Sequence, residues 1–168
     1  MEEEILENEK LEFDVTMTDS ILYDYQIYNS YCKSSNGMIG TCIGTLAIIL
    51  GLAYNYVAFI IMGVVLVFYT PISLKLRCKT VVANNKAFKE PLHYVFDETG
   101  ITVSQGESSE SAAWENMYRA VSTKQSIIVY TAKKLAWVFP RKQLGPKLPQ
   151  LIATISRYME PSKVRIRF

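Results

Sequence analysis

The amino-acid sequence predicts an α+β membrane protein, in which a hairpin of two transmembrane helices joins a small β domain that a C-terminal helix closes. Two observations lead to this fold class. Residues 37–74 contain no Asp, Glu, Lys, Arg or His, although charged residues make up 20% of the chain of 168 residues. After Pro91, short apolar runs alternate with turn residues, as in a β domain. The chain therefore divides into three predicted parts, residues 1–36, 37–74 and 75–168.

The charge-free segment has the length of two membrane spans, residues 37–54 and 56–74. A spanning helix needs about 20 apolar residues, and each half comes close to that length. Asn55, between two tyrosines, separates the halves, so the turn is very short and the helices are antiparallel. Gly40 and Gly44 have the GxxxG spacing that permits close helix contact. The alternative is one long core helix of a soluble protein, which a polar residue in mid-run does not favour.

Basic residues flank this segment, whereas its turn is uncharged. They are Lys33, Lys75, Arg77, Lys79, Lys86 and Lys89. Because cytoplasmic loops carry an excess of Lys and Arg, the pattern predicts a multi-pass protein of the cell membrane with both termini in the cytoplasm. Asn55 is then at the outer face.

Charge is distributed unevenly between the two flanks. Residues 1–36 carry nine acidic and two basic side chains, and residues 75–168 carry sixteen basic and seven acidic ones. The acidic start, with no early apolar run, excludes a cleaved signal peptide. The basic flank can contact an anionic leaflet. Three cysteines without ligand spacing argue against a disulfide framework and against a zinc site.

The N-terminal part predicts one strand and one helix. Residues 11–17 alternate between apolar and polar, which indicates a half-buried strand. Thr18 or Asp19 can cap the helix that follows. One face of this helix carries Ile21, Tyr25, Tyr28 and Cys32. That face fits either the headgroup zone of a membrane or the core of a soluble domain, and the sequence leaves both open.

The C-terminal part predicts a polar connector over residues 80–90, then six strands and a helix. A turn at residues 97–100 places Gly100 where positive φ is expected. Pro146 or Pro149 begins the helix, and residues 161–168 form a short basic strand or a loose tail. The predicted strands are residues 92–96, 101–105, 111–114, 117–123, 126–131 and 135–139.

Strands in meander order, closed by one amphipathic helix, are typical of a pleckstrin-homology-like (PH-like) barrel or sheet. That barrel has seven strands, so residues 11–17 are predicted to supply the seventh and to pair with the C-terminal domain. Trp114 and Trp137 lie in apolar strand patterns and are predicted to be core residues.

The order of these parts, together with two sequence stretches, resembles the bacterial YcxB-like family. The stretches are YVFDETGITVSQGESSESAAWENMYRAV and IIVYTAKKLAWVFPRKQL. The resemblance implies a bacterial membrane protein with a β-rich C-terminal domain. It brings no catalytic or ligand-binding residues with it.

The sequence holds no clear catalytic motif. His93 is the one histidine, so a Ser-His-Asp triad would depend on it entirely. No glycine-rich phosphate loop is present, and we expect no cofactor and no bound nucleic acid. The candidate site residues are basic, and we predict that they contact the membrane surface through anionic lipid headgroups. They are Lys75, Arg77, Lys79, Arg141 and Lys142. The alternative is that they are ordinary solvated charges.

These observations favour a non-enzymatic integral membrane protein. Its β domain would face the cytoplasm and interact with an unknown protein partner or with the membrane surface. An alternative is a self-protection (immunity-type) protein against a membrane-acting peptide or toxin, and an enzyme is the third hypothesis. The sequence does not predict an oligomeric state.

Overall fold

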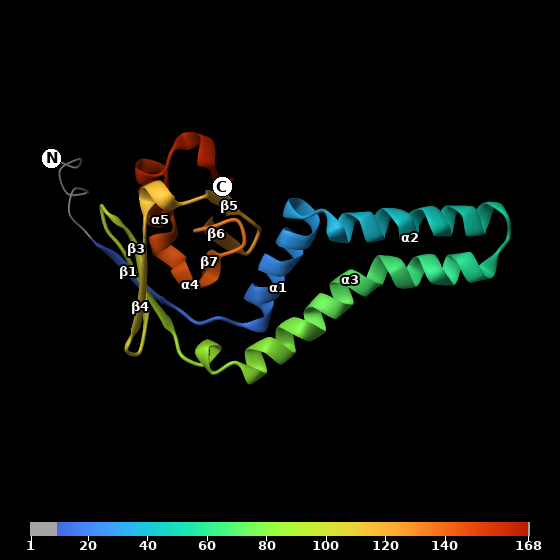
Figure 1. Ribbon diagram of the computed structural model, residues 1–168, viewed down its shortest axis with the longest axis horizontal. Helices are drawn as coiled ribbons and strands as arrows, with labels where there is room; N and C mark the ends of the chain where they lie inside the picture. The colour runs from blue at the N-terminus through green and yellow to red at the C-terminus, as the bar shows by residue number, and fades with distance from the viewer. Residues whose placement is uncertain (1–9, 168) are drawn as a thin grey trace. The chain divides into compact units, whose positions relative to one another are not determined.

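The computed structural model describes residues 10–167 and divides the chain into two units (Figure 1). The helical unit comprises residues 18–84. Of the described residues, the β unit comprises 85–167 together with 10–17, which precede the helical unit in the sequence. The acidic residues before Lys10, which belong to the predicted N-terminal part, lie outside the described residues.

The helical unit begins with α1 (Asp19–Tyr28), which continues into one π-helical turn, η2 (Asn29–Lys33). The Thr18 hydroxyl accepts a hydrogen bond from the Ile21 N–H at 3.4 Å, so the predicted cap is present. Two long helices follow, α2 (Asn36–Ala53) and α3 (Val57–Asn84), and α1 packs against α3.

Helices α2 and α3 run side by side in opposite directions, which confirms the predicted helical hairpin (Figure 1). Asn55 turns the chain with a φ of +57°, a left-handed conformation that Asn tolerates better than most residues. The backbones of the two helices approach each other closely where Gly44 faces Gly63. A Cβ atom on Gly63 would lie 2.5 Å from the Gly44 carbonyl oxygen, whereas one on Gly40 would meet nothing nearer than 3.9 Å. Of the predicted glycine pair, Gly44 therefore makes the close contact.

Helix α3 extends ten residues further than the sequence predicted. The second span was expected to end at residue 74 and a connector to occupy residues 80–90, but the helix continues to Asn84. The reason is that the residues after Leu74 change from apolar to polar without a helix stop: Pro91 comes seven residues after the helix end. The boundary between the two units consequently lies at residues 84–85.

The first sheet of the β unit contains four antiparallel strands in the order β1-β2-β3-β4. They are β1 (Leu11–Val15), β2 (Leu92–Phe96), β3 (Gly100–Gln105) and β4 (Ser108–Ala113). Strand β1 pairs with β2, with Phe13 opposite Tyr94. The predicted pairing of the N-terminal strand with the C-terminal domain is thus confirmed.

The second sheet has the order β7-β6-β5-β8. It contains β5 (Arg119–Ser122), β6 (Ser126–Tyr130), β7 (Ala136–Pro140) and the two-residue strand β8 (Val164–Arg165). Strand β8 pairs parallel to β5, so residues 161–168 include the short basic strand that the sequence left open. Helices α4 (Arg141–Leu144) and α5 (Leu148–Tyr158) lie between β7 and β8 in the sequence, and Pro149 occupies the first turn of α5.

The predicted PH-like barrel is wrong in one respect, because neither sheet closes into a barrel. Side chains bind the outer edge of β1 where a barrel would place another strand. The Gln143 amide donates to the Thr16 carbonyl and accepts from the Thr16 N–H, both at 2.9 Å. The Lys147 ammonium donates to the Glu12 carbonyl at 2.7 Å. These side chains form hydrogen bonds with backbone groups at the outer edge of β1 without closing the sheet.

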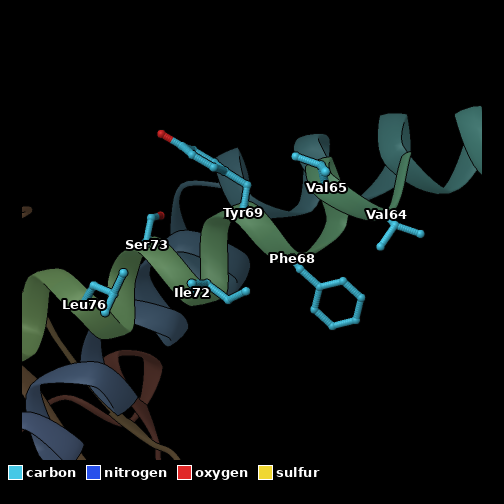
Figure 2. A pocket seen from close by; sticks show the side chains of 7 residues that line it. All are labelled: Val64, Val65, Phe68, Tyr69, Ile72, Ser73 and Leu76. Carbon is cyan, nitrogen blue, oxygen red and sulfur yellow. The ribbon is translucent and has the colours of Figure 1, made fainter. Parts of the chain in front are cut away.

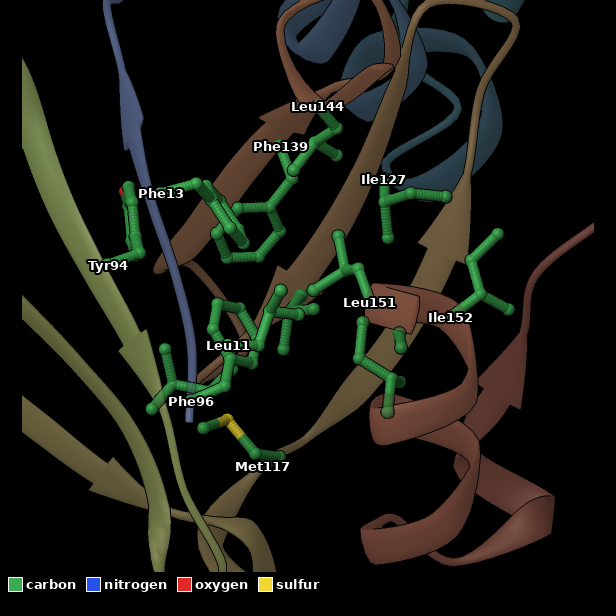
Figure 3. Packing of buried hydrophobic residues seen from close by; sticks show 14 of the residues in the cluster. Leu11, Phe13, Tyr94, Phe96, Met117, Ile127, Phe139, Leu144, Leu151 and Ile152 are labelled. Carbon is green, nitrogen blue, oxygen red and sulfur yellow. The ribbon is translucent and has the colours of Figure 1, made fainter. Parts of the chain in front are cut away.

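The core of the β unit lies among the two sheets and α5. Figure 3 shows Phe13, Tyr94 and Phe96 on one side of the core and Leu151 of α5 on the other, with Phe139 between them in this view. The Phe13 ring lies 5.4 Å from that of Phe96 and 5.8 Å from that of Phe139, measured between centroids.

Both tryptophans contribute to this core, as predicted. Trp114 is 5% exposed, and the partly buried Trp137 packs against the core. Trp114 does not belong to a strand, however, although the strand predicted over residues 111–114 included it. It begins the 3₁₀ turn η4 (Trp114–Asn116), and its indole N–H donates to the Asp97 carbonyl at 2.8 Å.

Asp97 organises the turn between β2 and β3. Its carboxylate accepts hydrogen bonds from the Thr99 hydroxyl, the Thr99 N–H and the Gly100 N–H. These bonds, chiefly that from the Thr99 hydroxyl, hold the pKa of the Asp97 carboxyl below its usual value. The prediction of positive φ at Gly100 is wrong, because positive φ occurs instead at Gly106 and Gly145. Gly100 is required for space, since a Cβ atom there would lie 2.1 Å from the Ala112 carbonyl oxygen.

We expect Asp97→Ala to lower the free energy of unfolding of the β unit by about 1–3 kcal/mol at pH 7, because hydrogen bonds to a charged acceptor are lost. The lowered pKa fixes the sign of the pH dependence. The stabilisation is complete above the unfolded pKa of about 3.9 and is lost as the pH falls through the folded value. Denaturant unfolding at pH 7 and pH 3 should therefore show a smaller difference between parent and variant at pH 3. An equal difference at both pH values would contradict the role of the charge.

Candidate functional site

The surface of α2 and α3 is the most distinctive feature of the helical unit. Both helices are long and apolar enough to cross a membrane. Their large apolar side chains point outward: Leu52 is 63% and Val57 66% exposed. An exposed apolar surface of this extent is typical of a membrane or protein contact. The exposed large residues of the two helices include Ile39, Ile43, Leu46, Ile49, Phe59, Ile61, Val65, Phe68 and Ile72.

A shallow pocket of about 550 Å³ lies on the outer side of α3 (Figure 2). Its lining comes from two adjacent rows of the helix, in which residues are spaced by four. One row is Val64, Phe68, Ile72 and Leu76, and the other is Val65, Tyr69 and Ser73. The pocket is therefore the groove between two ridges of one helix, a shape that accepts an acyl chain or the side chains of another helix.

The predicted membrane-contact residues belong to two different units. Lys75, Arg77 and Lys79 are exposed on α3, after the charge-free segment. Lys75 and Lys79 share one side of the helix because they are four residues apart, and Arg77 points to another side. Arg141 and Lys142 begin α4 in the β unit.

Arg141 has a structural contact that the sequence did not predict. Its guanidinium donates to the Arg167 carbonyl at 2.8 Å, and the Arg167 N–H donates to the Ser122 hydroxyl at 2.7 Å. Arg141 therefore fastens the residues after β8, whereas Lys142 is exposed. A contact between these two side chains and lipid headgroups stays a prediction.

On one face of the first sheet, the strand register places three polar side chains side by side on neighbouring strands. Asp14 lies opposite His93, with 2.7 Å between the carboxylate and Nδ1, and Ser104 follows opposite His93 on β3. This order matches the acid, base and hydroxyl of a catalytic triad. However, no hydrogen bond joins Ser104 to His93 in the described residues, and the His93 side chain is 44% exposed. We interpret the Asp14–His93 pair as a cross-strand contact that fastens β1 to β2.

An open groove of about 1020 Å³ lies between the start of β1 and α5 in the β unit. Its lining includes apolar side chains and side chains of both signs of charge, among them Lys10, Arg157 and Glu98. This mixture does not select one class of ligand. The lining residues are Lys10, Leu11, Phe96, Asp97, Glu98, Thr99, Pro146, Pro149, Gln150, Ala153, Thr154, Arg157 and Tyr158. Within residues 10–167, no group of three or more His, Cys, Asp or Glu side chains is placed to hold a metal ion.

These features define an α+β protein that joins a hairpin of two long apolar helices to a unit of two open sheets. The model of the YcxB-like protein family matches residues 96–154, so the chain is similar to that family in this segment. The match confirms the resemblance read from the sequence. It begins at the last residue of β2 and ends within α5, so it lies entirely in the β unit. No curated protein and no solved structure matched the chain.

Proposed function

We propose that this chain is a non-enzymatic integral membrane protein whose hairpin spans the cell membrane and whose β unit binds a partner in the cytoplasm. The observation that carries the proposal is the hairpin surface. It has no charged side chain over 38 consecutive residues, and its large apolar side chains point outward. In water, this surface would lose the stabilisation of about 25 cal/mol per Å² that burial provides.

Pairing of β1 with β2 supports an even number of membrane crossings. The two strands pair antiparallel along their whole length, from Leu11 opposite Phe96 to Val15 opposite Leu92. They do so although the hairpin separates them in the sequence. Both ends of the hairpin must therefore be on the same side of any membrane that it spans. Two spans satisfy this condition and one does not.

The flanking charges support a cytoplasmic location for that side. Lys75, Arg77 and Lys79 are exposed directly after the apolar part of α3, and the turn at Asn55 is uncharged. Positive residues stay preferentially in the cytoplasm, where they also meet anionic lipids. The self-protection alternative stays a prediction, since no contact among the described residues favours it.

Cysteine labelling tests the proposed topology. In a background with the three native cysteines replaced by serine, we expect Asn55→Cys to react with a membrane-impermeant maleimide on intact cells. The matched variant Lys89→Cys should react only after the cells are permeabilised. The reverse pattern, or recovery of the protein in the soluble fraction, would contradict the proposal.

A further inference from the structure

Strand β4 forms one edge of the first sheet and is exposed along its length. It pairs with β3 on one side, and none of the described residues pairs with its other side. Ala112 is partly buried, and the other five residues of the strand are exposed. An edge strand of this kind presents unpaired N–H and C=O groups to a further strand.

The remaining sheet edges are less accessible. Gln143 and Lys147 bind the outer edge of β1. Strand β8 has two residues. Strand β7 is buried at three of its five positions and ends at Pro140, which has no N–H to donate. Strand β4 is therefore the longest and most exposed edge among the described strands.

The hydrogen-bond pattern identifies which backbone groups face outward. Just beyond the strand, the Trp114 N–H donates to the Thr99 carbonyl at 3.2 Å. Because alternate residues bond to the same neighbour in an antiparallel pair, Ser108, Glu110 and Ala112 also direct their backbone groups toward β3. The N–H and C=O groups of Ser109, Ser111 and Ala113 consequently point away from the sheet.

We propose that the β4 edge binds an extended peptide with Lys or Arg at alternate positions, which adds a fifth strand to the first sheet. The charges near the edge favour a basic peptide. Residues 107–113 include Glu107 and Glu110 but no Lys or Arg, whereas beyond the strand the Glu115 carbonyl accepts a hydrogen bond from the Lys163 ammonium at 3.5 Å. A basic side chain opposite Glu110, on the same face, gains a cross-strand charge pair. This inference deepens the proposed function by naming its binding surface, and it rests on that function for the cytoplasmic location of the partner.

The same charges disfavour a second copy of the chain as the occupant. Two copies of β4 can pair antiparallel only when their outward-facing residues oppose one another. In one of the two registers with most overlap, Glu110 lies opposite its own copy. Like charges directly opposite destabilise a strand pair.

Fluorescence anisotropy with the purified full chain in neutral detergent tests the proposal. The probe is a short fluorescein-labelled peptide of alternating Thr and Lys, and the control peptide alternates Thr and Glu. We expect saturable binding of the basic peptide and at least a tenfold weaker affinity for the acidic one, which meets like charge. The assay does not depend on membrane topology, so its failure is distinguishable from failure of the labelling experiment.

Substitutions at Ser111 distinguish backbone pairing from simple charge attraction. Ser111→Pro removes an outward N–H without removing a bond to β3, and we expect at least a fivefold loss of peptide affinity. The matched variant Ser111→Ala keeps the N–H and should bind like the parent. Glu110→Gln should weaken binding by roughly two- to fivefold.

Several outcomes would overturn the proposal. One is unchanged affinity for Ser111→Pro that retains the parent's tryptophan fluorescence. If this variant unfolds, the parent protein is tested instead with a basic peptide that is N-methylated at alternate residues. Equal affinity for the methylated and the unmethylated peptide would also refute strand addition. A concentration-dependent dimer that Glu110→Gln strengthens, with no peptide binding, would assign the edge to a second copy.

Discussion

Replacing Phe13 by alanine is expected to lower the free energy of unfolding of the β unit by about 3–5 kcal/mol, the usual cost of truncating a buried phenylalanine. Phe13 is 8% exposed, and its ring contacts those of Tyr94, Phe96 and Phe139. The loss would be large because the cavity opens at the joint between the two sheets. One residue of a five-residue strand thus stabilises a unit whose other strands all follow the hairpin in the sequence.

Denaturant unfolding followed by tryptophan fluorescence measures this effect in the β unit, since both tryptophans of the chain belong to it. Glu12→Ala is the matched control on the same strand. Lys147 contacts the Glu12 carbonyl and not its side chain, so this substitution should change stability by less than about 0.5 kcal/mol. Equal effects of the two substitutions would mean that β1 does not pack into the core.

Gly100→Ala is expected to destabilise the β unit by about 3 kcal/mol or more. The added Cβ atom would lie 2.1 Å from the Ala112 carbonyl oxygen and 2.9 Å from the Ala113 Cα atom. Both are backbone atoms, so relief requires β3 and β4 to separate. Overpacking usually costs 1–3 kcal/mol, and a clash with backbone belongs at the upper end of that range or beyond it.

Gly106→Ala provides the comparison, because it changes conformation without a clash. Gly106 has a φ of +57°, the conformation that a two-residue hairpin turn with glycine at its first position requires. An added Cβ atom there meets nothing within 4 Å. We expect a cost of about 1–2 kcal/mol. If denaturant unfolding shows a larger effect for Gly106→Ala than for Gly100→Ala, the spatial explanation of Gly100 is wrong.

The sequence predicted those elements that a local pattern of apolar and polar residues identifies. Alternation over residues 11–17 revealed β1, and the absence of charge together with Asn55 revealed the helical hairpin and its turn. The pairing of β1 with the C-terminal domain was also predicted. An isolated strand leaves its backbone groups unpaired, so it required a partner elsewhere in the chain.

Features that depend on distant neighbours were not predictable in the same way. The sequence could not show that the Gln143 amide binds the edge of β1, and the prediction of a PH-like barrel or sheet was based on the number and order of the strands. The Asp14–His93 contact and the space required at Gly100 both arise from strand register. The end of α3 was missed because a polar helix and a polar connector have similar composition.

The position of β1 in the chain has a consequence for biosynthesis. Seventy-six residues separate the end of β1 from the start of β2. At about 5–20 residues per second, a ribosome takes roughly 4–15 s to supply the partner strand. During this interval the apolar side of β1 has no sheet to join, and the hairpin emerges in the meantime. Under the proposed topology, a chain whose hairpin inserted with its ends on opposite sides of the membrane could not complete the sheet, so such molecules would display an unfolded domain to cellular proteases.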